Sequence, residues 1–141
     1  MRIWKGIQMK SLEKALIARS HAYTPYSHFK VGAAILLKDG TYVLGANIEN
    51  SSFGLSNCAE RSALFSLYSQ GYKKEDIVSM TIVANDHGPV SPCGACRQVM
   101  HELLPKDTKI ILANTKGKTM ETTPDGLLPY AFVLDEKPKD E

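Results

Sequence analysis

The sequence predicts an α/β fold in which helices cover a mixed sheet. A nearly continuous apolar run at Val31–Leu37 is typical of a strand that is buried on both faces. Asp39-Gly40 then predicts a tight hairpin turn, with residues 41–46 as the antiparallel partner strand. Beyond this hairpin, helical and strand patterns alternate along the chain. That order predicts helices layered on a sheet with both parallel and antiparallel strands.

The chain of 141 residues is expected to form one domain, residues 1–141. Residues 1–9 are expected to be a loosely held lead-in, and Ser11 is expected to cap a first helix that ends ahead of Pro25. Residues 47–57 are polar and too long for a simple turn, which favours a functional loop. Further expected elements are strands at Ile77–Ala84 and at residues 109–113, and a helix that starts at Thr123-Pro124.

Composition excludes several classes of protein. The net charge is +2, with 17 basic and 15 acidic residues, which is too weakly basic to favour a nucleic-acid partner. No apolar run approaches the roughly 18 residues of a membrane span, and the N-terminus has no signal-peptide core. The three cysteines have no disulfide-framework spacing, which suits a reducing compartment. A cytoplasmic protein without a membrane partner is expected.

The most informative stretch is S-P-C-G-A-C-R-Q at residues 91–98. Cys93 and Cys96 have the spacing that lets two thiolates bind one metal ion. Apolar residues continue at helical spacing after Cys96, so both thiols are expected in the first turn of a helix. Pro92 suits that first turn as well. The helix dipole, roughly +0.5 charge at this end, favours thiolate over thiol.

A third thiol completes the expected site. Cys58 opens the sequence Cys58-Ala59-Glu60-Arg61 at the start of another helical pattern. Three thiolates fill three positions of a tetrahedral zinc site and leave the fourth to water, as in catalytic zinc sites. Glu60 is close enough in sequence to reach that water without being a ligand. This layout is typical of the zinc deaminases.

The residues also predict a mechanism. Zinc lowers the pKa of bound water from 15.7 to about 7, which makes hydroxide available for attack on the ring carbon that carries the amine. Glu60 could take the water proton, deliver it to a ring nitrogen and later protonate the leaving amine. Three thiolates would leave excess negative charge on the site. We hypothesise that Arg61 hydrogen-bonds a thiolate and tunes the zinc.

Two other interpretations of the cysteines are open at this point. A closed structural zinc site would need a fourth protein ligand, for which His87 or His101 could serve. A redox pair of Cys93 and Cys96 would leave Cys58 unexplained.

Five blocks of the sequence resemble the small tetrameric cytidine deaminases. The resemblance runs from about Ser11 to about Phe132, with the blocks in the family's order. Ser56 departs from it, because many relatives have a further cysteine there that is not a zinc ligand. The blocks are Y-T-P-Y-S-H-F-K-V-G-A-A (residues 23–34), N-I-E-N (47–50), N-C-A-E-R-S-A (57–63), P-C-G-A-C-R-Q (92–98) and L-L-P-Y-A-F (127–132).

The resemblance implies a three-layer α/β/α sandwich with a mixed five-stranded sheet, assembled as a homotetramer with shared active sites. It implies one zinc ion per subunit, bound by Cys58, Cys93 and Cys96, with Glu60 as the proton shuttle. Adjacent subunits are expected to lend residues from the segment around Ser51 and Phe53.

The resemblance also implies a set of substrate-binding residues. Asn47 and Glu49 would hold the ribose 3′-hydroxyl, and Phe29 would pack against the pyrimidine. Phe132 would reach into an active site, that of a neighbouring subunit. Ala59 would also contact the substrate.

The expected function is hydrolytic deamination of free cytidine and 2′-deoxycytidine to uridine and 2′-deoxyuridine, in pyrimidine salvage. The alternative enzyme is a deaminase of cytosine-containing antibiotics such as blasticidin S, which shares C-A-E and P-C-G-x-C-R-Q. The N-I-E-N block argues against that alternative, since in the family it serves a ribose hydroxyl.

Overall fold

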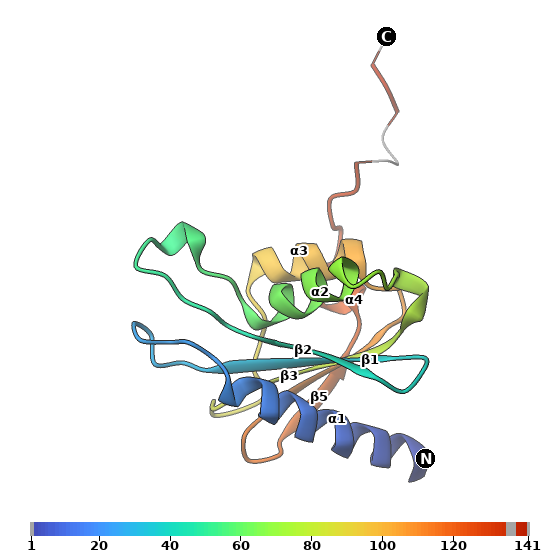
Figure 1. Cartoon of the computed structure of the whole chain (residues 1–141). Helices are drawn as coiled ribbons and strands as arrows, with labels where there is room; N and C mark the ends of the chain where they lie inside the picture. The colour runs from blue at the N-terminus through green and yellow to red at the C-terminus, as the bar shows by residue number, and fades with distance from the viewer. Residues whose placement is uncertain (1, 135–137, 141) are drawn as a thin grey trace.

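The computed structural model describes residues 2–134 and 138–140 and has an α/β architecture (Figure 1). Five strands form one sheet in the order β2-β1-β3-β4-β5. The helices are α1 (Arg2–Ser20), α2 (Ala59–Ser69), α3 (Gly94–Leu103) and the short α4 (Pro124–Leu127), with 3₁₀ turns η1 (Phe53–Leu55) and η2 (Lys74–Asp76). The strands are β1 (Val31–Leu37), β2 (Tyr42–Ala46), β3 (Ile77–Ala84), β4 (Lys109–Asn114) and β5 (Thr119–Thr122).

The sheet is mixed, as the sequence predicts. β1 pairs antiparallel with β2 and with β3, and β4 pairs antiparallel with β5. The neighbouring strands β3 and β4 are parallel, because α3 carries the chain back across the sheet between them. The predicted hairpin is confirmed, with Gly40 at a positive φ of 88° in its turn.

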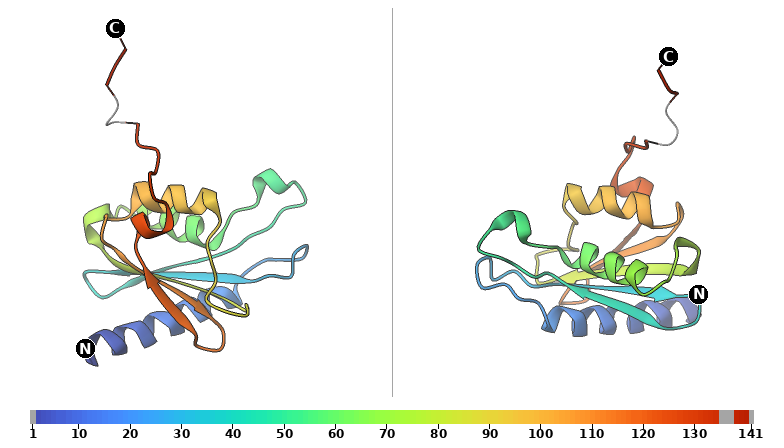
Figure 2. Two further views of the ribbon diagram at one scale, coloured as in Figure 1. Left: turned by 180° about the vertical axis from the view of Figure 1, so that it is seen from behind. Right: turned by 45° about the horizontal axis from the view of Figure 1, so that its top comes forward.

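Helices cover both faces of the sheet and make three layers. Helix α1 lies along one face, and α2, α3 and α4 lie on the other (Figures 1 and 2). The larger hydrophobic core lies on the α2 and α3 side, and a smaller cluster under α1 includes Ala15, Ala34 and Val83. The predicted three-layer sandwich with a mixed five-stranded sheet is therefore confirmed. No helix of the described residues combines the length and the apolar character needed to cross a bilayer.

Two glycines bring the flanking helices unusually close to the sheet. A Cβ built on Gly32 of β1 would lie 2.1 Å from the carbonyl oxygen of Ala15 in α1. A Cβ built on Gly45 of β2 would lie 2.4 Å from the backbone nitrogen of Ala63 and 2.5 Å from the carbonyl oxygen of Ala59, both in α2. Both contacts are backbone to backbone, so neither helix can sit at this depth over a residue with a side chain.

The predicted lead-in at residues 1–9 is wrong for residues 2–9, which form the first turns of α1; Met1 lies outside the described residues. Trp4 stabilises these turns, since the Lys109 ammonium lies 4.2 Å from the centre of its ring. Ser11 consequently lies inside the helix and does not cap it. Its hydroxyl is 3.0 Å from the phenolic oxygen of Tyr42 in β2.

Two long loops meet at one end of the sheet. Residues 21–30, before β1, and residues 47–57, between β2 and α2, project together beyond the sheet (Figure 2). A bridge joins Tyr23 to Ile48, and a second bridge joins Ile48 to Asn57. The predicted polar loop at residues 47–57 therefore has a defined shape next to the N-terminus of α2.

Candidate active site

The N-termini of α2 and α3 bring the three cysteines together. Cys58 is the N-cap of α2 and Cys93 is the N-cap of α3, both with extended backbone. Cys96 is the third residue of α3, and Pro92 lies one residue before the cap, not inside the first turn as expected. The positive ends of two helix dipoles thus lie beside the sulfur atoms, which favours thiolates there.

The sulfur atoms have the spacing of a metal site. All three lie within 4.8 Å of one another, and the Sγ atoms of Cys58 and Cys93 are 3.9 Å apart. Zinc–sulfur bonds of about 2.3 Å in a tetrahedron place two sulfurs about 3.8 Å apart. The thiol groups are therefore suited to holding a zinc ion without rearrangement of the backbone.

A closed four-ligand zinc site receives no support. We call the cluster of Cys58, Cys93 and Cys96 the thiol group. In the part of the chain that the structure describes, no histidine belongs to this cluster. His101 instead pairs with Asp125, at 3.2 Å between Nε2 and Oδ1. His87 lines a separate polar pocket with Lys116 and Lys118.

Arg61 makes the contact that the sequence predicts. Its guanidinium donates a hydrogen bond to Cys58 Sγ at 3.2 Å. A hydrogen bond from the Cys96 thiol, together with the Arg61 guanidinium, lowers the pKa of Cys58 to about 5. The same hydrogen bond and its burial raise the pKa of Cys96. In the metal-free state, the lowered pKa of Cys58 and the raised pKa of Cys96 mean that Cys58 ionises more readily than Cys96.

Glu60 is the buried acid of this cluster. Its side chain is only 4% exposed, and burial raises its pKa to about 7. The Cys58 thiolate raises the pKa of Glu60 further, whereas Arg61 lowers it. A carboxyl group with a pKa near neutrality can both accept and release a proton at physiological pH, which is what a proton shuttle requires.

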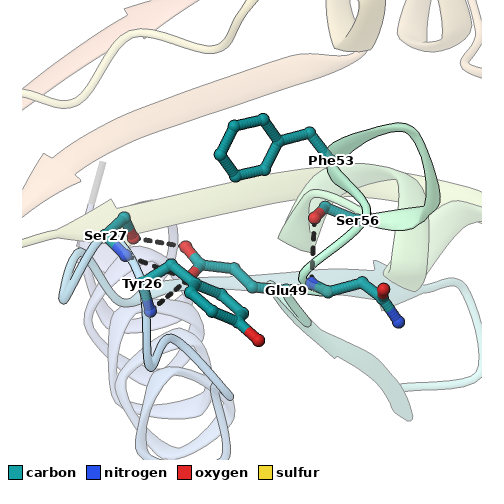
Figure 3. Close-up of a pocket in the computed structure, with 6 residues that line it drawn as sticks. Tyr26, Ser27, Glu49, Phe53 and Ser56 are labelled. Atoms are coloured by element: carbon teal, nitrogen blue, oxygen red, sulfur yellow. Dashed lines mark hydrogen bonds between the residues drawn. The ribbon is translucent and has the colours of Figure 1, made fainter.

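Glu49 belongs to a second polar cluster, in a pocket of about 350 Å³ lined by residues of the two long loops (Figure 3). Its carboxylate accepts hydrogen bonds from the backbone N–H groups of Tyr26 and Ser27, each at 3.1 Å, and from the Ser27 hydroxyl. The Ser27 hydroxyl is the main reason that the pKa of Glu49 lies below its usual value. Phe53 lines the same pocket.

Asn47 fixes the loop that precedes β1. Its Oδ1 accepts a hydrogen bond from the Val31 N–H at 2.9 Å, and its Nδ2 donates to the Phe29 carbonyl at 2.8 Å. The ring-bearing residue Phe29 is therefore held beside the end of β2, with 40% of its surface exposed. Sequence reasoning missed the role of Tyr26 and Ser27 in orienting Glu49, although both lie in one of the five blocks.

The predicted site residues thus fall into three groups. Ala59, buried as the first residue of α2, lies in the thiol group with Glu60. Asn47, Glu49 and Phe29 form the loop group. Phe132 makes the third group: its carbonyl accepts a hydrogen bond from Gln98 of α3, and 58% of its surface is exposed.

Comparisons with known proteins agree with this geometry. The family model described as the cytidine and deoxycytidylate deaminase zinc-binding region matches residues 7–112. The chain is 54% identical over 125 residues to the cytidine deaminase of Halalkalibacterium halodurans, which covers 89% of this chain and 93% of that protein.

Solved structures give the same result. The crystal structure of cytidine deaminase from Burkholderia pseudomallei matches with a TM-score of 0.85 at 48% identity, over 88% of this chain and 98% of that one. That of cytidine deaminase from Mycobacterium tuberculosis matches with a TM-score of 0.72 at 37% identity, over 86% and 94%. A mixed sheet, a group of three thiols beside a buried glutamate, and these matches lead to one conclusion: the chain belongs to the zinc-binding cytidine and deoxycytidylate deaminase family.

Proposed function

We propose that the protein hydrolyses free cytidine and 2′-deoxycytidine to the corresponding uridines and ammonia. The observation that carries this proposal is the buried carboxyl of Glu60 next to three thiols that leave a tetrahedral metal site one ligand short. We infer the nucleoside from the relatives, which are named cytidine deaminases. The pocket at Glu49 supports a free nucleoside, because a carboxylate suits a ribose hydroxyl and would repel a phosphate backbone.

Cys58, Cys93 and Cys96 would hold one zinc ion per subunit. When bound there, zinc supplies a water molecule that is acidic enough to lose a proton near neutral pH. Arg61 would offset part of the negative charge of the three thiolates through its bond to Cys58.

Glu60 would carry the protons of the reaction. It takes one proton from the attacking water and gives it to N3 of the ring, while the oxygen bonds to C4. It then helps to transfer the second water proton to the departing amine, so that cytidine and water become uridine and ammonia. A pKa of about 7 suits both the acceptance of a proton from water and its release to the substrate.

The loop group would bind the nucleoside. Glu49 already has its carboxylate oriented by Tyr26 and Ser27, so it can accept a hydrogen bond from the ribose 3′-hydroxyl without ordering a flexible side chain. Asn47 would assist at the ribose, and Phe29 would pack against the pyrimidine. Ala59 would contact the substrate through its backbone at the start of α2.

We also propose a homotetramer with shared active sites. Large apolar side chains stand exposed in the single chain, among them Phe53 at 81%, Leu55 at 73% and Phe132 at 58%. Phe53 also lines the Glu49 pocket, so a neighbouring copy packed on this loop would border the substrate. Pyrimidine salvage and a cytoplasmic location stay predictions, and three unpaired thiols at close range support the second.

Incubation of the zinc-loaded protein with cytidine and deoxycytidine, followed by ultraviolet absorbance, tests the proposal. Glu60→Gln is the matched control, because it keeps the shape of the side chain and removes its acid. We expect conversion by the wild type and a loss of about a hundredfold or more in kcat for the variant. A folded wild type with one zinc per chain that converts neither nucleoside would overturn the proposal, and blasticidin S would then be the next substrate to test.

A further inference from the structure

Two consecutive residues of α3 hold both ends of the segment 127–132, which we call the closing segment. The Arg97 guanidinium donates to the carbonyl of Leu127 at 2.8 Å. The Gln98 side-chain amide donates to the carbonyl of Phe132 at 3.2 Å. Leu127 is the last residue of α4, so no N–H group within that helix can donate to its carbonyl. Arg97 provides the donor instead.

Arg97 also binds the loop that leads into Cys93. Its Nε donates to the Pro92 carbonyl at 2.9 Å, and a second guanidinium nitrogen donates to the Ser91 hydroxyl at 2.6 Å. One half-buried, planar side chain therefore joins the entry to the thiol group with the start of the closing segment. A lysine could not replace it, because one ammonium cannot reach three acceptors that lie in a fixed fork.

The closing segment has a shape that needs such support. Tyr130 has a φ of +57° and its ring is fully exposed. Non-glycine residues avoid this left-handed region, and they persist there only where the surrounding structure fixes the backbone. The bonds at Leu127 and at Phe132 fix the chain on either side of Tyr130.

We propose that Arg97 and Gln98 are positioning residues of the deaminase reaction: by holding the closing segment against α3, they present the exposed Phe132 to an active site shared with a neighbouring copy. This inference rests on the proposed function. Within the part of the chain that the structure describes, the side-chain hydrogen bond of Gln98 goes to the closing segment, so its loss weakens substrate binding and leaves the chemical step in place. Arg97 also binds the loop before Cys93, so its loss affects both substrate binding and turnover.

The decisive variant is Gln98→Glu. It preserves size and helix propensity, but an ionised carboxylate cannot donate a hydrogen bond to the Phe132 carbonyl. The matched control is Tyr68→Phe, which removes another side-chain bond to a carbonyl of α3, that of Leu103 at 2.7 Å, away from the closing segment. Steady-state kinetics on cytidine, zinc content, thermal unfolding and hydrogen exchange of residues 128–132 would be measured on each protein.

For Gln98→Glu we expect KM to rise about three- to tenfold, as for the loss of one hydrogen bond, with kcat and zinc content within about twofold of wild type. Amide exchange in residues 128–132 should accelerate in this variant and not in Tyr68→Phe. Arg97→Lys should raise KM and also lower kcat. An active wild type whose KM is unchanged in Gln98→Glu would overturn the positioning role alone, as would an equal KM change in Tyr68→Phe. A wild type without activity on cytidine would overturn the proposed function and the positioning role together.

Discussion

Gly45 offers a direct test of how the sheet positions the active site. A Cβ at this residue would lie 2.4 Å from the Ala63 nitrogen, whereas ordinary contacts begin at 3.4 Å. Neither neighbour is a flexible side chain, so Gly45→Ala must push α2 away from the sheet by about 1 Å. Helix α2 starts at Ala59, directly after Cys58, and carries Glu60, so the acid and one thiol move with it.

The expected effects follow from that displacement. Overpacking costs about 1–3 kcal/mol of unfolding free energy, and a helix shift of this size costs more where backbone meets backbone. A misplacement of about 1 Å in a reacting geometry lowers the rate by about a hundredfold. Gly45→Ala should therefore lower kcat on cytidine about a hundredfold, and weaken zinc binding, in the fraction of protein that remains folded.

Gly32→Ala is the matched control. Its Cβ would clash with the Ala15 carbonyl at 2.1 Å, so it displaces α1 on the opposite face by a similar amount. We expect the two variants to unfold at similarly lowered temperatures, by about 4 °C for each kcal/mol, and only Gly45→Ala to lose kcat per folded molecule. Equal kcat losses in both variants, or wild-type kcat in Gly45→Ala, would refute the reasoning.

Four further predictions concern single side chains. Arg61→Ala should reduce zinc affinity about tenfold and lower turnover, because a donor to a thiolate is lost; competition with a chelator and kcat measure this, and unchanged values of both would contradict it. In the metal-free protein, a Glu60 pKa raised to about 7 means that folding favours the protonated acid. The wild type should therefore lose stability relative to Glu60→Gln as pH rises from about 4.5 to about 7, by about 3 kcal/mol in urea unfolding, and parallel pH profiles would speak against it. Glu49→Gln should raise KM for cytidine roughly tenfold with little change in kcat, since a neutral amide is a weaker acceptor for a ribose hydroxyl; equal KM values would remove Glu49 from the site. Tyr130→Gly should raise the free energy of unfolding by about 0.5–1 kcal/mol, because glycine relieves the left-handed backbone and the ring is fully exposed, whereas Tyr130→Ala should give no gain; a destabilised Tyr130→Gly would indicate that the ring packs against another copy.

The parts of the fold that were predictable from sequence depend on local signals. The runs at Val31–Leu37 and Ile77–Ala84 are buried on both faces, so their apolar character marks them as strands without knowledge of their partners. Thr123 indeed caps α4, with its side chain accepting from the Gly126 N–H. β5 has a mostly exposed, polar sequence and shows no such pattern, so only the family resemblance implied a fifth strand.

The errors arise where distant residues decide the structure. In the first turns of α1, Trp4 packs against the Lys109 ammonium, more than a hundred residues away, and no local pattern reveals that contact. The orientation of Glu49 likewise depends on Ser27 in a separate loop. By contrast, the cluster of three cysteines was predictable. The ligands of one zinc ion must lie close together in space, however far apart they are in sequence.

The thiol group also acts as a tether between distant parts of the chain. Cys58 and Cys93 are 35 residues apart in sequence, with all of α2 and β3 between them, and one ion bound to both closes this loop. Such a cross-link needs no oxidant, and because the folded chain binds the ion in preference to the unfolded one, each tenfold rise in free zinc above the dissociation constant adds about 1.4 kcal/mol to stability. The zinc ion therefore stabilises the fold as well as enabling the chemistry. Zinc depletion should shorten the lifetime of the folded protein as well as stop its turnover.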